Sequence, residues 1–164
     1  MKKLLFILSA ISAAVLVWSL GSAPAAGDAK AEITALEHKA IAATNTDEFM
    51  AFADEKNIVF YDYVRPLQHV GAKAVRATLD NFFNNAKNVK GEITALNVVA
   101  DEGVGIARSL QHFTWTDKDG KPAEATFRVT DGWHKVNGKW KLFHSHISLP
   151  IDAATGKAEM NLKE

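Results

Sequence analysis

The sequence predicts an α+β fold in which three N-terminal helices pack on one face of a curved, mostly antiparallel sheet. Apolar residues recur at helical spacing in the first half of the chain, and from Gly91 onward they occur in long strand-like runs separated by turns. Helices and strands that are segregated in this way are typical of α+β folds. A twisted sheet covered by helices leaves a tapering, cone-shaped pocket between the layers.

Residues 1–25 have the pattern of a signal peptide, so they are set apart from the fold. Lys2 and Lys3 precede an almost wholly apolar run from Leu4 to Leu20. Ala23-Pro24-Ala25 then provides an A-x-A site with cleavage before Ala26. We therefore expect a periplasmic or secreted protein with no stable membrane association after cleavage. The alternative is a retained anchor helix, for which about 17 apolar residues is the lower limit.

Three helices and one short strand are predicted between residues 26 and 87. Residues 26–31 are small and polar and predict a flexible lead-in to a first helix over residues 32–44. Thr46 is the expected N-cap of a short second helix with two acids in its first turn. The β-branched and aromatic run at residues 58–63 predicts a strand, and Gly71 precedes a third helix over residues 72–87.

Four long strands follow and form an antiparallel meander. Turn-forming residues separate them, and Asn137-Gly138 predicts a tight hairpin. The expected strands are 92–101, 104–116, 123–136 and 139–149, followed by a polar C-terminal tail over residues 153–164.

Composition excludes several classes of function. The 164 residues fit one domain, and 19 basic and 19 acidic residues give no net charge and no long basic run. We therefore expect no nucleic-acid partner. The chain contains no cysteine, which excludes disulfides, thiol catalysis and thiolate metal sites. We expect no cofactor, and a homodimer is the default assembly for such a domain.

Asp62 is the first candidate for catalysis. Strand alternation places it on the same side as Ile58 and Phe60, which suggests that it points into the pocket. A carboxylate in an apolar pocket has a raised pKa and can act as a base. The alternative is a solvated acid at a strand end. Tyr61 and Trp115 are expected to contact a ligand, although Trp115 could instead belong to the core or an interface.

Two histidines near the end of the chain are the other catalytic candidates. His144 and His146 alternate with apolar or small residues and are expected to share a face with Trp140 and Leu142. Two imidazoles near a carboxylate could relay protons, bind an anion or ligate a metal. The alternative is a pair of structural histidines. No metal site is expected, because the sequence does not indicate a third ligand.

Two segments resemble a known family. Residues 133–148, Trp-His-Lys-Val-Asn-Gly-Lys-Trp-Lys-Leu-Phe-His-Ser-His-Ile-Ser, resemble the last hairpin of SnoaL-like domains, which belong to the nuclear transport factor 2-like superfamily. The G-K-W-x-x-x-H-x-H-x-S pattern is also similar to the association domain of calcium/calmodulin-dependent protein kinase II. Residues 60–71 resemble the SnoaL-like segment before the third helix. The resemblance covers about residues 29–152 and implies a SnoaL-like domain over residues 26–152.

The resemblance also implies site residues. Ketosteroid isomerases of this superfamily place their catalytic Asp nine residues before the glycine that opens the next helix, and Asp62 and Gly71 have this spacing. SnoaL-like domains often carry an R-x-T pattern at the position of Arg128 and Thr130, with the Arg in the pocket. In one departure from the isomerases, residues 38–43 contain no Tyr to stabilise an enolate. Asp131 lies near the position of the second acid of that oxyanion site, one residue out of register.

Two functions remain open from the sequence. The first is acid–base chemistry of the isomerase, cyclase or dehydratase type on a small organic substrate, with Asp62 or a histidine as the base. Arg128 or a histidine would then stabilise the oxyanion. The second is a non-catalytic ligand-binding or oligomerisation module, as in the kinase association domain. Fold membership does not decide between them.

Overall fold

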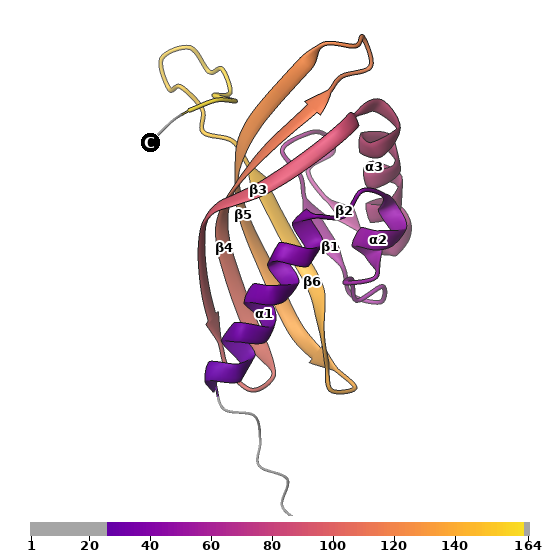
Figure 1. Cartoon of the computed structure of the whole chain (residues 1–164), viewed down its shortest axis with the longest axis vertical. Helices are drawn as coiled ribbons and strands as arrows, with labels where there is room; N and C mark the ends of the chain where they lie inside the picture. Colours follow the sequence, from indigo (N-terminus) through magenta and orange to yellow (C-terminus); the bar gives the residue numbers. More distant parts are fainter. Residues whose placement is uncertain (1–25, 163–164) are drawn as a thin grey trace, which may run out of the picture.

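The structure, a computed structural model, describes residues 26–162, so the expected signal peptide lies outside the described residues. It contains three helices in that range: α1 (Ala26–Ile41), α2 (Thr46–Met50) and α3 (Ala72–Asn85). All three lie on one side of the sheet, with α1 running along it and α2 and α3 close together (Figure 1). The predicted flexible lead-in at residues 26–31 is wrong, because Ala29 is fully buried one turn before Ile33 and extends the helix.

Six strands form one mixed sheet in the order β2-β1-β6-β5-β4-β3. The strands are β1 (Val59–Tyr61), β2 (His69–Val70), β3 (Lys87–Ala100), β4 (Val104–Thr116), β5 (Pro122–Val136) and β6 (Lys139–Ser148). All pairs are antiparallel except β1 with β6. The predicted α+β fold with N-terminal helices on a curved sheet is confirmed, and the sheet is not closed (Figure 1).

Two details of the sheet differ from the predicted elements. The third helix ends at Asn85, and β3 begins at Lys87, where Lys87 pairs with Thr116 of β4. The short strand β2 was not predicted; its His69 pairs with Phe60 of β1. In both places, hydrogen bonding to a distant strand decides the backbone conformation, which local spacing does not reveal.

The main core lies between the helices and the sheet. Its largest fully buried side chains include Trp133, Leu142, Ile33, Ile58 and Val75. A second, smaller cluster lies toward the other end of β5 and contains Ala125, Phe127 and Val129, against which Met160 of the C-terminal tail packs.

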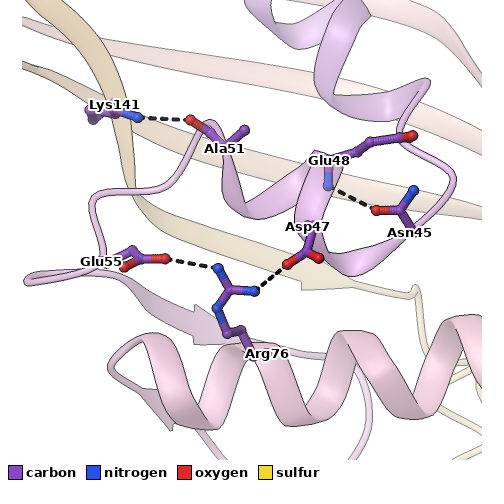
Figure 2. Close-up of polar contacts among 7 residues, drawn as sticks. All are labelled: Asn45, Asp47, Glu48, Ala51, Glu55, Arg76 and Lys141. Carbon is purple, nitrogen blue, oxygen red and sulfur yellow. Dashed lines mark hydrogen bonds and ion pairs between the residues drawn. The ribbon is translucent and has the colours of Figure 1, made fainter.

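Polar contacts hold α2 and α3 together at the surface (Figure 2). The Arg76 guanidinium on α3 donates to Asp47 on α2 over 2.7 Å and to Glu55 in the following loop over 2.9 Å. Lys141 on β6 donates to the Ala51 carbonyl over 2.7 Å. The helix pair is thereby linked to β6, and the exposed ion pairs each contribute little to stability.

The N-cap of α2 is Asn45, one residue before the predicted Thr46. The Asn45 side-chain oxygen accepts from the Glu48 amide over 3.0 Å, as Figure 2 shows. Thr46 instead is buried as the first helical residue. Asparagine and threonine both suit a cap, so burial of the threonine side chain decides between them.

Candidate active site: an aromatic cavity with buried carboxyl groups

A cavity of about 370 Å³ lies between the inner face of the sheet and the helices. This volume falls within the size range of small-molecule pockets. Its walls are mostly apolar, and aromatic rings from α2, β1, α3, β4, β5 and the loop after β1 contribute to them: Phe49, Phe60, Tyr63, Phe82, Phe83, Phe113, Trp115 and Phe127. Of the predicted ligand-contacting residues, Trp115 lines this cavity.

The charged groups among the lining residues are almost all acids. Glu37 comes from α1, Asp131 from β5, and Asp62 directly follows β1. The turn after β4 adds Asp117 and Lys118, and the Lys118 ammonium contacts the exposed Asp119 carboxylate over 2.8 Å. The interior of the cavity therefore contains carboxyl groups without a facing cation.

Glu37 and Asp131 form a buried pair of acids. Glu37 is 1% exposed and Asp131 is 8% exposed. The Trp133 indole donates to Glu37 Oε1 over 2.6 Å, which fixes the Glu37 side chain against the sheet. Ser145 of β6 faces Asp131 in the strand register and donates to its carboxylate. Asp131 Oδ1 is buried and has no hydrogen-bond partner in the described protein.

Burial keeps a proton on this pair. Desolvation and the negative charge of Asp131 raise the pKa of Glu37 from 4.5 to about 9. Desolvation also raises the pKa of Asp131, from 3.8 to about 6, against the lowering effect of hydrogen bonds from Ser145 and Glu37. At neutral pH, Glu37 is therefore protonated, and its O–H donates a hydrogen bond to the Asp131 carboxylate. This shared proton is the one donor of the pair, and Glu37 can redirect it from Asp131 to an oxygen atom in the cavity.

Asp62 lines the cavity from the end of β1. Its Oδ2 accepts from the Thr78 hydroxyl of α3 over 3.4 Å, whereas its Oδ1 is buried without a partner among the described residues. Burial, and to a smaller extent the Asp62 charge, raises the pKa of the neighbouring Tyr63 phenol. The inward direction expected for Asp62 from strand alternation agrees with this position.

The predicted histidines lie on the other face of the sheet. A β-bulge in β6 is the cause: Gly132 pairs with His144, and Trp133 pairs with Leu142, so that Phe143 is an extra residue. Leu142 is buried against the helices, whereas His144 lies on the outer face with its Nδ1 3.1 Å from the Val59 carbonyl oxygen. The expectation that the histidines share a face with Trp140 and Leu142 is wrong.

The other predicted residues on the outer face are near these histidines. Tyr61 makes edge-to-face contacts with His144 and His146, with ring centroids 4.9 and 5.8 Å apart. Thr130 pairs with His146 across the strands. Arg128 donates to the Leu149 carbonyl over 3.0 Å. Arg128 lies between Phe127 and Val129, which both line the cavity, so it points away from the cavity, and the pocket position that the resemblance implied for it is wrong.

Glu37 is the site residue that the sequence reasoning missed. It lies four residues after the fully buried Ile33 and so falls on the buried face of α1. An acid within the apolar stripe of a helix was the available signal. Asp131, which the resemblance placed one residue out of register with the second acid of the isomerases, lines the cavity together with Glu37.

Within residues 26–162, no group of three or more His, Asp or Glu side chains has an arrangement suited to a metal ion. The described helices are also too short or too polar to span a membrane.

Comparisons with known proteins identify the family. A family model described as "SnoaL-like domain" matches residues 31–152, which is most of the chain. The chain belongs to the SnoaL-like domain family. The resemblance stated from the sequence is therefore confirmed. No curated protein matches the chain significantly.

Solved structures show the same fold. A nuclear transport factor 2-like protein of unknown function from Pseudomonas putida is 24% identical, with a TM-score of 0.75 over 86% of this chain and 100% of that chain. A superfamily protein from Salmonella enterica is 18% identical, with a TM-score of 0.70 over 81% and 99% of the chains. The association domain of Caenorhabditis elegans calcium/calmodulin-dependent protein kinase II is 16% identical, with a TM-score of 0.58 over 75% and 97%. At these identities the likeness concerns the fold.

Proposed function

We propose that this SnoaL-like protein binds a small, mainly apolar organic molecule in the aromatic cavity and catalyses proton transfer on it. The observation that supports this most directly is the buried Glu37–Asp131 pair, which retains a proton at neutral pH in a cavity that also contains Asp62. Titratable groups whose surroundings separate their pKa values are the usual parts of an acid–base site.

The chemistry assigned to the site is enolisation. An Asp62 oxygen takes a proton from the carbon next to a carbonyl group, and the C–H electron pair forms a carbon–carbon double bond. The carbonyl π electrons move to its oxygen, which receives a hydrogen bond or a proton from the Glu37–Asp131 pair. Return of a proton to carbon completes an isomerisation. Ketosteroid isomerases use a protonated carboxylic acid in an apolar site for the same purpose.

Proton exchange of a simple ketone tests this proposal. The protein, incubated with 2-tetralone in D₂O, is expected to accelerate replacement of the α-protons, followed by NMR. Asp62→Asn should lower the exchange rate by about 10²-fold or more, because the amide cannot accept the proton. Asp80→Asn makes the same change at an exposed acid of α3 and serves as the control. Exchange that is unchanged in Asp62→Asn would contradict the assignment of the base.

The second candidate is a binding or assembly module without catalysis, and the fold likeness to the kinase association domain favours it. In that case a ligand would bind in the cavity, but no ketone would exchange its α-protons faster than in buffer. Sedimentation velocity tests the assembly, for which we propose a homodimer.

We also propose that the protein is exported and loses residues 1–25. The charged start, apolar run and A-x-A site support this. Expression of the full chain in a bacterium, followed by intact-mass measurement of the periplasmic fraction, should find a protein that begins at Ala26. Recovery of the uncleaved chain in the membrane fraction would instead indicate a retained anchor.

A further inference from the structure

We infer that the cavity prefers cationic ligands: apolar, ring-bearing molecules that carry a protonated amine, in preference to neutral or acidic molecules of the same shape. This names the substrate class of the site described above and rests on the proposal that the cavity is the functional site.

The first argument is the balance of charge inside the cavity. Asp62, Asp117 and Asp131 line it beside the protonated Glu37, while the lining residue with a positive charge, Lys118, contacts the exposed Asp119 carboxylate over 2.8 Å. Carboxylates removed from water are unfavourable unless a cation or hydrogen-bond donors compensate them. A ligand with a positive charge would supply that compensation, whereas an acid would add to the repulsion.

The second argument is independent of the number of acids. Oδ1 of Asp62 and Oδ1 of Asp131 are both buried without a hydrogen-bond partner among the described residues, and Asp131 is only 8% exposed. Such orphaned acceptors are rare in folded proteins and indicate a missing donor. An ammonium group has several N–H donors and no acceptor, so it suits an unpaired carboxyl oxygen such as either of these.

The third argument is the chemistry of the walls. The cavity rings, such as Phe60, Phe113 and Trp115, offer π faces that attract cations more strongly when water is excluded. A charge on the substrate also helps the proposed reaction. Enolisation places a negative oxygen near existing carboxylates, and a cationic group in the same molecule offsets this repulsion.

A matched series of three ligands tests the inference: 4-phenylbutylamine, 4-phenylbutan-1-ol and 4-phenylbutanoate, titrated calorimetrically at neutral pH. The amine should bind about tenfold more tightly than the alcohol, which corresponds to one desolvated cation–π or charge contact. The acid should bind more weakly than the alcohol. Equal affinities for all three, or tightest binding of the acid, would overturn the inference.

Two further measurements locate the preference in the cavity. Asp62→Asn should reduce the preference for the amine over the alcohol, whereas Asp80→Asn should retain it; an unchanged preference in Asp62→Asn would overturn the inference. The wild-type preference should persist at high salt, because buried charges are screened less than surface charges. Its disappearance at high salt would indicate attraction to the surface acids and would likewise overturn it.

The outcome is separable from that of the proposed catalysis. Exchange of 2-tetralone protons without any charge preference would remove the inference and leave the proposed reaction. A charge preference without exchange of any ketone would remove the proposed reaction and leave a cavity for cationic ligands.

Discussion

At the residue scale, the buried Glu37 makes the stability of this protein depend on pH. Its pKa is raised from 4.5 to about 9 by burial and by the nearby Asp131. Between these values the folded state binds more protons than the unfolded state, so the free energy of unfolding falls as pH rises. The stabilising contribution is complete below about pH 4.5 and is lost as pH rises through about 9.

Glu37→Gln should therefore flatten this dependence. The amide oxygen still accepts from Trp133, and the amide N–H can still donate toward Asp131, but no proton is lost at high pH. Urea unfolding at about pH 5 and about pH 8.5 measures how far the free energy of unfolding falls between these two pH values. This fall should be at least about 1 kcal/mol larger for wild type than for Glu37→Gln.

Glu32→Gln is the matched control for this measurement. Trp140 donates to Glu32 over 2.5 Å on the same helix, but the Glu32 side chain is 50% exposed. The free energy of unfolding of Glu32→Gln should therefore change with pH as it does in wild type. Equal slopes for wild type and Glu37→Gln would contradict the buried, protonated state of Glu37.

At the element scale, a glycine sets how closely α1 approaches the sheet. A Cβ atom built on Gly105 of β4 would lie 2.3 Å from Ile33 Cδ1 and 3.0 Å from Ala100 Cβ. Ile33 is fully buried, so its side chain cannot turn out into solvent to make room. The helix must stay in place to hold Glu37 against Trp133.

Gly105→Ala should lower the free energy of unfolding by about 1–3 kcal/mol, because the extra methyl group overfills this contact. Gly103→Ala, in the preceding turn, is the control, since nothing lies within 4 Å of its added Cβ. Urea midpoints measure both. If the two variants unfold at the same urea concentration, the close approach of α1 at Gly105 is contradicted.

The bulge in β6 is the other decisive feature at this scale. A single extra residue, Phe143, turns His144 and His146 to the outer face and keeps Ser145 on the cavity side. The Phe143 ring lies against Gly132, where an added Cβ would come within 2.8 Å of it. Because Gly132 has no side chain, the Phe143 ring can pack against it on the outer face.

At the scale of the whole molecule, the helices and the sheet together create the cavity, so a ligand bound there should stabilise the entire fold. At a concentration of 4-phenylbutylamine 100 times its Kd, mass action adds about 2.7 kcal/mol to the free energy of unfolding. This should raise Tm by between about 5 and 15 °C, measured by circular dichroism.

Butylamine provides the comparison, because it has the ammonium group but no ring to fill the aromatic cavity. At the same concentration it should change Tm much less. A similar rise with both amines would mean that the charge binds at the surface, outside the cavity.

The sequence by itself determined the classes of element and their order, since helical and strand-like spacing are properties of neighbouring residues. It also determined the family, through the residues of the last hairpin, and the inward direction of Asp62 directly after the short strand β1. Each of these depends on local periodicity or on motifs within one segment.

Only the tertiary structure decided which polar groups meet. Glu37 and Asp131 are far apart in the chain and form a pair because α1 packs against β5, where Trp133 holds the glutamate. The bulge at Phe143 reversed the expected faces of His144 and His146, because one extra residue shifts a period of two. The raised pKa values also come from burial, and burial is a property of the assembled layers rather than of any one segment.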